Sequence, residues 1–171
     1  HETHKPWLGA HNHDVEQMKF DRILLDVPCS ATGIIRRHPD IKLLRHKSDI
    51  AKLSIIQLDL LHKAFELLKI DGELLYSTCS ILPDENDEVI GKFLAERSNA
   101  VSEALLSWCK SQSRESITTG STVESYQLSD QWWTLSESVE TRFGLQFFPT
   151  QKEHDGFYYA RLKKVAEKHP T

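Results

Sequence analysis

The stretch FDRILLDVPCS, residues 20–30, decides the fold, because a short apolar run ends on a carboxylate and a cysteine. A run of this length, bounded by Pro-Cys-Ser, predicts a buried parallel strand over residues 20–26 whose carboxyl end carries function. A second stretch of the same kind, ELLYSTCS at residues 73–80, predicts another strand over 73–78 that leads directly into Cys79. The two stretches together indicate a sheet with a cysteine after each of two strands.

The segment between these strands predicts a long helix. Ser48 can cap a helix that continues to about Lys69, where Asp71-Gly72 ends it. Apolar residues spaced by three and four place one face of this helix against the sheet. That face is expected to comprise Leu53, Ile56, Leu60, Ala64 and Leu67.

A second helix is expected after Pro83. Acidic residues follow the proline, and they suit the positive end of a helix dipole. Later in the chain, residues 144–148 and 157–162 predict two strands joined by a polar turn through Asp155-Gly156. The order strand, helix, strand, helix and two strands indicates an open α/β sheet. We treat residues 1–171 as one partial domain and divide it into an irregular lead-in (1–19), a core (20–97), a variable segment (98–154) and a last strand with tail (155–171).

Composition agrees with one globular domain. The 171 residues are 39% hydrophobic and 27% charged, and no apolar run approaches the length of a membrane span. Three cysteines are too few for a disulfide framework, which favours a reducing, cytoplasmic setting. The net charge of −4 argues weakly against a nucleic-acid partner, but residues 36–52 carry a local basic excess.

The carboxyl ends of neighbouring strands share one edge of such a sheet, where ligands bind. Cys29 and Cys79 are therefore expected to face one another if their strands are adjacent. A lone cysteine is more often a buried small hydrophobe, but two at equivalent strand ends favour function. Cys109 lacks such company, and we expect a structural role for it. Four histidines (His1, His4, His11 and His13) lie in the lead-in without a completing ligand set, so no metal site is expected.

Four motifs carry a resemblance to a known family. DVPCSATG at 26–33 resembles the fourth motif of RNA 5-methylcytosine methyltransferases, and STCSI at 77–81, with the Pro and Glu-Asn that follow, resembles their sixth. GIIRRHPDI at 33–41 and DGFYYA at 155–160 are similar to the bacterial Sun/Fmu type of that family, whose members modify 16S ribosomal RNA. The resemblance covers about half of the chain.

The resemblance implies a fold, a reaction and roles for three residues, and the charge of two arginines adds a candidate RNA contact. The fold would be the C-terminal half of a Rossmann-like S-adenosylmethionine-dependent methyltransferase sheet. Cys79 would be the nucleophile that adds to carbon 6 of cytosine, and Cys29 would act in the release step. Asp26 is similar to a residue of the family's cofactor site. Arg36 and Arg37 can meet phosphates of the partner, 16S rRNA, in the cytoplasm.

S-adenosylmethionine sites on this fold also need a glycine-rich turn after the first strand. The seven glycines of this chain are too far apart to form one. We therefore expect a C-terminal piece, with most cofactor contacts upstream and negligible methylation by the piece alone.

Two alternatives stay open. A DNA cytosine-5 methyltransferase uses the Pro-Cys cysteine and a Glu-Asn-Val helper, but here Asp87 follows Glu85-Asn86 and Ser30 follows Cys29. A non-catalytic RNA-binding or assembly module could keep the same fold without turnover. A thiol-disulfide function is the weakest candidate, because no Cys-X-X-Cys pair exists.

Overall fold

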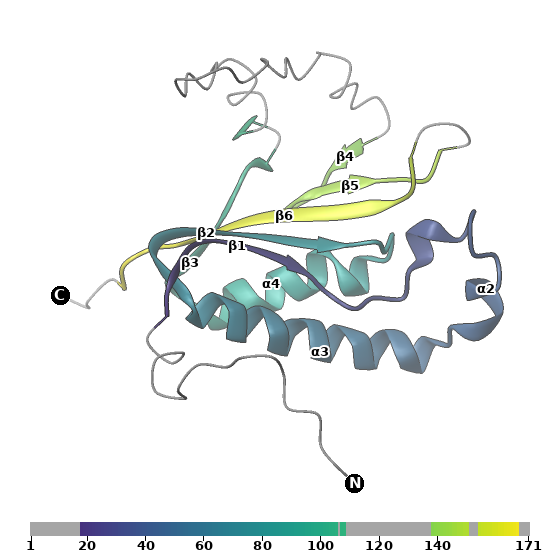
Figure 1. Ribbon diagram of the computed structural model, residues 1–171, viewed down its shortest axis with the longest axis horizontal. Helices are drawn as coiled ribbons and strands as arrows, with labels where there is room; N and C mark the ends of the chain where they lie inside the picture. The colour runs from purple at the N-terminus through teal and green to yellow at the C-terminus, as the bar shows by residue number, and fades with distance from the viewer. Residues whose placement is uncertain (1–17, 106, 109–137, 151–153, 168–171) are drawn as a thin grey trace, which may run out of the picture.

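The computed structural model describes residues 18–105, 107, 108, 138–150 and 154–167, which form a mixed sheet with helices on one face (Figure 1). The expected order of a strand, a long helix, a strand, a second helix and two late strands is confirmed, and β3 and β4 are additional strands within the variable segment. The elements are β1 (Phe20–Asp26), η1 (Thr32–Ile34), α2 (Ile41–Leu44), α3 (Lys47–Glu66), β2 (Leu68–Thr78), η2 (Pro83–Glu85), α4 (Asp87–Glu96), β3 (Ala100–Glu103), β4 (Ser138–Glu140), β5 (Leu145–Phe147) and β6 (Phe157–Lys164).

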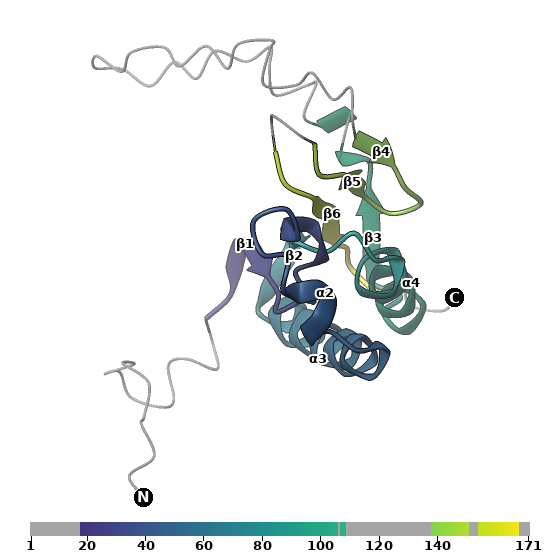
Figure 2. The same cartoon turned by 90° about the vertical axis from the view of Figure 1, so that its right-hand side faces the viewer.

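The sheet brings the two predicted cysteine-bearing strands together. Its order is β1-β2-β6-β5-β4, with β3 paired to β6 beside this path. β1 and β2 are parallel, whereas β6 runs antiparallel to β2, β3 and β5. Both long helices, α3 and α4, lie on the same side of the sheet (Figures 1 and 2).

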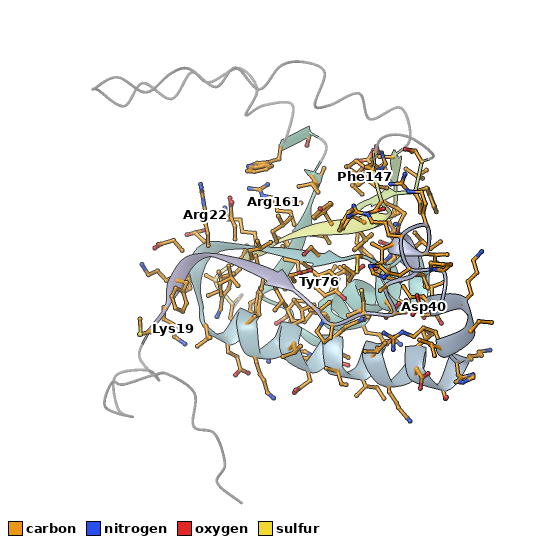
Figure 3. The ribbon with its side chains drawn as sticks, turned by 45° about the vertical axis from the view of Figure 1, so that its right-hand side comes forward. Lys19, Arg22, Asp40, Tyr76, Phe147 and Arg161 are labelled. Carbon is orange, nitrogen blue, oxygen red and sulfur yellow. The ribbon has the colours of Figure 1, made fainter. Side chains whose placement is uncertain are left out.

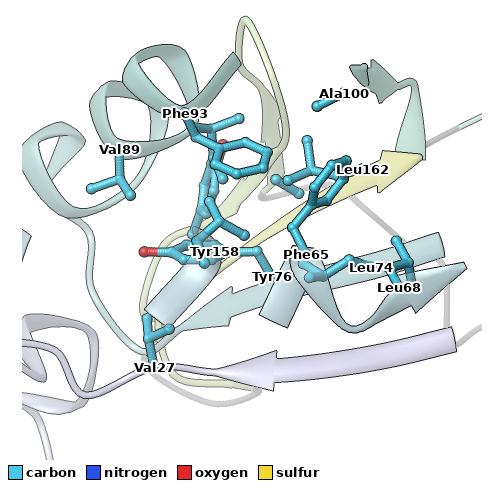
Figure 4. Packing of buried hydrophobic residues seen from close by; sticks show 13 residues of the cluster. Val27, Phe65, Leu68, Leu74, Tyr76, Val89, Phe93, Ala100, Tyr158 and Leu162 are labelled. Atoms are coloured by element: carbon cyan, nitrogen blue, oxygen red, sulfur yellow. The ribbon is translucent and has the colours of Figure 1, made fainter. Parts of the chain in front are cut away.

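The main core fills the space between the helices and the sheet. Phe65 of α3 and Phe93 of α4 meet edge to face with ring centroids 5.0 Å apart, an arrangement that aromatic pairs favour. Tyr76 and Tyr158 lie beneath them, each fully buried (Figure 4). Tyr76 points towards the helices, whereas Arg161 lies on the other face of the sheet (Figure 3).

The long helix α3 begins and ends earlier than expected. Its N-cap is His46, whose backbone N–H donates to the Asp49 carboxylate at 3.0 Å, so the predicted capping by Ser48 is wrong. The helix ends at Glu66, and β2 starts two residues later. Asp71 therefore lies inside a strand, in the left-handed region at φ 64°, instead of ending a helix.

The buried face of α3 agrees only in part with the expected one: Leu60 and Ala64 are partly buried and pack against the core. Gln57, Leu61 and Phe65 are buried, whereas Ile56 (46% exposed) and Leu67 lie at the surface. Apolar residues occur on several sides of this helix, so their spacing is compatible with more than one face. The three buried residues are spaced by four, so they lie on one side of the helix. Packing against the sheet determines that this side is the buried one.

Strand β1 is parallel to β2, as expected, but it is not buried. Its burial pattern is mostly exposed, and the Leu24 side chain is 69% accessible. Among the described residues β1 pairs only with β2, and five of its seven residues are exposed. No helix in this described part of the chain is long and apolar enough to cross a bilayer.

Candidate active site

The two cysteines lie together at the carboxyl ends of β1 and β2. The strands remain paired up to Asp26 and Ser77, so the loops that follow leave the sheet side by side. The sulfur atoms of Cys29 and Cys79 are 3.2 Å apart, and both residues are partly exposed. The prediction that the two thiols face one another is confirmed.

The two thiols have shifted pKa values, and the shifts have opposite signs. A hydrogen bond from the Cys29 thiol lowers the pKa of Cys79 to about 7, although burial and the charges of Asp26 and Glu85 oppose this shift. The same hydrogen bond, and then burial, raise the pKa of Cys29 far above its ordinary value. The largest cause of the lowered Cys79 pKa is therefore the neighbouring thiol. Cys79 is therefore the thiolate of the pair near neutral pH.

This arrangement makes the alkylation of Cys79 depend on Cys29. In the native protein we expect the rate of reaction of Cys79 with iodoacetamide to rise with pH through a midpoint near 7. Cys29→Ala removes the hydrogen bond to the thiolate, so the midpoint should move to higher pH by about one unit or more. Mass spectrometry of the Cys79 peptide after timed alkylation measures both midpoints. An unchanged midpoint in Cys29→Ala would contradict the coupling of the two thiols.

Backbone contacts tie the two cysteine loops to one another. The Gly33 N–H donates to the Cys79 carbonyl at 2.8 Å, and the Ile81 N–H donates to the Thr32 hydroxyl at 3.1 Å. Ala31 adopts the left-handed conformation at φ 62°, which costs energy for a residue with a Cβ. Backbone strain of this kind persists only where the surrounding structure fixes the conformation, and it is frequent at functional sites.

The late motif DGFYYA, residues 155–160, contacts the first cysteine loop although it lies far away in the sequence. The Gly156 N–H donates to the Gly33 carbonyl at 2.9 Å. A Cβ on Gly33 would collide with the Gly156 carbonyl and lie 2.8 Å from the carbonyl oxygen of Cys79. Only glycine at position 33 permits this approach of three backbone segments.

Arg36 and Arg37 both face the buried carboxylate of Asp155. Arg36 lies 3.5 Å from one oxygen, and Arg37 forms an ion pair with the other. The guanidinium groups are partly exposed, so they can also reach a phosphate outside the protein. Their structural role is to attach the first cysteine loop to the late motif, and RNA binding by them stays a prediction.

Asp26 lies at the end of β1, where it is exposed. Its carboxylate accepts a hydrogen bond from the Ser77 hydroxyl at 3.0 Å. On the other face of the sheet, the Arg161 guanidinium lies over the Trp108 ring, 5.1 Å from the ring centroid. Within the described residues no cluster of three histidine, cysteine or acidic side chains could hold a metal ion. Cys109, Tyr126, Trp132, Trp133 and the four lead-in histidines lie outside the described residues.

One residue of the site was not recognised from sequence. Glu85 was expected to serve as an acidic residue of a helix N-terminus, but its side chain is fully buried. Its carboxylate accepts hydrogen bonds from Ser30 and Ser80, the residues that directly follow the two cysteines. The repeated Cys-Ser pair was the available signal, but the sequence does not show that both serines meet one carboxylate.

The architecture defines the class of protein. Two parallel strands with cysteine loops at their carboxyl ends, an antiparallel β6 beside them and two helices on one face make a partial Rossmann-like methyltransferase fold. The family model described as 16S rRNA methyltransferase RsmB/F matches residues 6–163. The chain belongs to this family.

Relatives and solved structures agree with this assignment. The chain is 43% identical over 148 residues to ribosomal RNA small subunit methyltransferase B of Pasteurella multocida, covering 86% of the chain and 27% of that protein. It resembles a methyltransferase homologue from Pyrococcus horikoshii, with 27% identity, a TM-score of 0.55 and coverage of 90% and 42%. It also resembles NSun6 from Pyrococcus horikoshii, solved with SFG, with 25% identity, a TM-score of 0.57 and coverage of 88% and 31%. The chain thus spans about a quarter of the length of the curated relative.

Proposed function

We propose that the whole protein, to which this chain contributes the two cysteine loops, transfers a methyl group from S-adenosylmethionine to carbon 5 of a cytosine in 16S ribosomal RNA, in the cytoplasm. The family and the names of its relatives support rRNA methylation. The observation that carries the cytosine-5 chemistry is the pair of sulfur atoms 3.2 Å apart, one of them acidified by the other. Two thiols at this spacing can reach adjacent carbons of one pyrimidine ring.

The reaction needs a nucleophile because carbon 5 of cytosine is weakly nucleophilic. The Cys79 thiolate forms a bond from sulfur to carbon 6, and the electron pair of the ring double bond moves towards carbon 5. Carbon 5 can then accept an electrophilic methyl group. The low pKa of Cys79 supplies its thiolate at neutral pH without a separate base.

Release requires a base that removes the proton of carbon 5. When the Cys79 sulfur bonds to carbon 6 it loses its negative charge, and with it the hydrogen bond that keeps Cys29 protonated. The pKa of Cys29 should therefore fall, and its proton can pass to solvent because the residue is partly exposed. The Cys29 thiolate then takes the proton of carbon 5. The double bond re-forms, and the sulfur–carbon bond breaks to return the Cys79 thiolate.

Two of the described residues, Asp26 and Tyr159, would line one side of the cofactor site in this proposal. Asp26 presents an exposed carboxylate at the carboxyl end of β1, where it can accept hydrogen bonds from a ligand. Burial, and then the charge of Asp26, raise the pKa of Tyr159. The two side chains are therefore close enough to interact electrostatically. S-adenosylmethionine, when bound, supplies the methyl group as an electrophile. The structure of NSun6 with SFG, an analogue of S-adenosylmethionine, supports this choice of methyl donor.

Base recognition requires an unstacked cytosine, because thiols cannot reach carbon 6 within a stacked helix. Arg36 and Arg37 stand near the cysteine loops and would supply sequence-independent attraction to phosphates. Their ion pairs with Asp155 would hold the guanidinium groups in place for that contact.

The proposal is tested by methyl transfer in vitro. The whole protein, incubated with labelled S-adenosylmethionine and unmodified 16S rRNA, is expected to yield 5-methylcytidine after digestion to nucleosides and mass spectrometry, whereas the 171-residue chain alone is expected to yield almost none. Methylation of DNA but not of RNA would favour the DNA-type alternative. RNA binding without any methylated nucleoside would favour the non-catalytic module.

The geometry already weighs against the DNA-type arrangement. That scheme needs the acidic residue of the Glu-Asn motif to meet the target base. Glu85 is fully buried, and both of its carboxylate oxygens accept hydrogen bonds within the protein. A second cysteine at the end of β2 would also have no role there.

A further inference from the structure

The side chain of Glu85 is a buried acceptor with four donors. Its Oε1 accepts the Ser30 N–H at 2.8 Å and the Gln57 amide at 3.1 Å. Its Oε2 accepts the Ser30 hydroxyl at 2.5 Å and the Ser80 hydroxyl at 2.6 Å. Four bonds equal the acceptor capacity of a carboxylate, so the group is fully occupied by its neighbours.

The two serines attach this carboxylate to both halves of the cysteine pair. Ser30 directly follows Cys29 in the loop after β1, and Ser80 directly follows Cys79 in the loop after β2. The loops come from different strands, and their serine hydroxyls also lie 3.3 Å from each other. The Glu85 carboxylate is therefore a common anchor, one residue away from each sulfur-bearing residue.

The anchor itself is held firmly. The Tyr76 hydroxyl donates to the Glu85 carbonyl at 2.8 Å, and Tyr76 is part of the buried core. The Gln57 amide that meets the carboxylate also donates to the Pro28 carbonyl at 2.9 Å, just before the first cysteine. Both the backbone and the side chain of Glu85 are thus fixed by residues of β2 and α3.

Burial of this carboxylate has an energetic cost. None of the ion pairs found among the described residues includes Glu85, so no cation offsets the loss of hydration. Its charge also opposes formation of the Cys79 thiolate. The Glu85 carboxylate is thus costly to bury and disfavours the Cys79 thiolate. Its presence is best explained by the position that it imposes on the two cysteine loops.

We propose that Glu85 is a positioning residue whose carboxylate, through Ser30 and Ser80, holds the two cysteine loops in the register that the release step needs. This inference rests on the proposed function for the identity of that step. Cys29 must reach the proton on carbon 5 while Cys79 is bonded to carbon 6. A loop displaced by about 1 Å can lower a rate by about 100-fold even when every reacting group is present.

The test uses variants of the native protein that loosen the loops without touching either thiol. Ser30→Ala and Ser80→Ala each remove one hydroxyl from the carboxylate, and the double variant removes both. Glu85→Ala removes the anchor, whereas Glu85→Gln keeps its shape and an amide that can still bond to the serines. Asp87→Asn is the matched control, because Asp87 is another hydrogen-bonded acid that accepts the hydroxyls of Thr141 and Tyr158, both at 2.7 Å, away from the cysteines.

In the double serine variant we expect kcat to fall about 10- to 100-fold while KM changes little, with accumulation of the covalent RNA adduct. The alkylation midpoint of Cys79 should also move to higher pH, because a loosened Cys29 donates a poorer hydrogen bond. Glu85→Gln should retain more kcat than Glu85→Ala. Asp87→Asn should lose stability but keep the kcat of the folded molecules and the midpoint.

Two results would overturn the inference. One is a double serine variant that behaves like Asp87→Asn, losing stability alone. The other is equal kcat in Glu85→Gln and Glu85→Ala, with both midpoints unchanged from that of the wild type. Failure of the proposed function looks different, because the wild-type protein would then form no adduct and transfer no methyl group. The alkylation midpoints would still test the anchor in that case.

Discussion

Cys79→Ala should abolish both methyl transfer and the covalent adduct, with a fall in kcat of roughly 10⁴-fold or more. The reason is that alanine offers no electron pair to carbon 6, and Cys29 cannot replace it. The Cys29 thiol is the protonated partner, with a pKa raised by its hydrogen bond to Cys79 and by burial. Methyl transfer to 16S rRNA and gel retardation of a covalent protein–RNA complex measure the two losses.

Cys29→Ala is the control that separates the two sulfurs. It should lose turnover yet retain the adduct, because the bond to carbon 6 forms at Cys79 and only its release fails. RNA that contains 5-fluorocytosine sharpens the comparison, since fluorine cannot leave as a proton does. An adduct that persists in Cys79→Ala and disappears in Cys29→Ala would reverse the roles and favour the DNA-type arrangement.

Gly33→Ala should disrupt the site without changing any polar side chain. The added Cβ would collide with the Gly156 carbonyl and press on that of Cys79, and backbone atoms cannot swing aside as a long side chain can. Overpacking of this kind costs about 1–3 kcal/mol of unfolding free energy, and occasionally more. Displacement of the Cys79 loop should lower kcat by about 100-fold beyond the loss of folded protein. Thermal unfolding and the kcat of the folded fraction measure the two effects.

Gly91→Ala is the matched control. Gly91 lies inside α4, where alanine is favoured over glycine by up to about 1 kcal/mol. The nearest atom to its added Cβ is a ring carbon of Phe143 at 3.1 Å, which can move slightly. Stability within about 1 kcal/mol of the wild type and unchanged kcat are expected. Equal loss of kcat in both variants would mean that the contact between Gly33 and Gly156 has no special importance.

The local pattern predicted the strands and helices well but not their exact bounds and faces. The apolar run at 20–26 correctly predicted strand β1, because an apolar run this short between polar boundaries is more typical of a strand than of a helix. The face of α3 was predicted only in part, because apolar residues such as Ile55, Leu58 and Leu61 make its pattern compatible with more than one face. Only the position of the sheet decides which row is buried. That position depends on pairings between residues far apart in the chain.

The site was predictable where it follows from strand ends and not where it follows from distant contacts. Cys29 and Cys79 were expected to face one another because parallel neighbours end at one edge. The acidification of Cys79 by a thiol, and the ion pairs of Arg36 with Asp155, depend on distances that the sequence does not encode locally. Glu85 was assigned to a helix start because its environment comes from loops up to 55 residues away.

The pairing of β2 with β6 has a consequence for synthesis of the protein. Thr78, the residue before Cys79, lies opposite Tyr158, so the sheet beside the cysteine loops is incomplete until β6 has left the ribosome. Contacts of such long sequence separation form slowly, because the intervening chain must first be brought together. The part of the sheet next to the cysteine loops is therefore completed late, only after β6 has been translated.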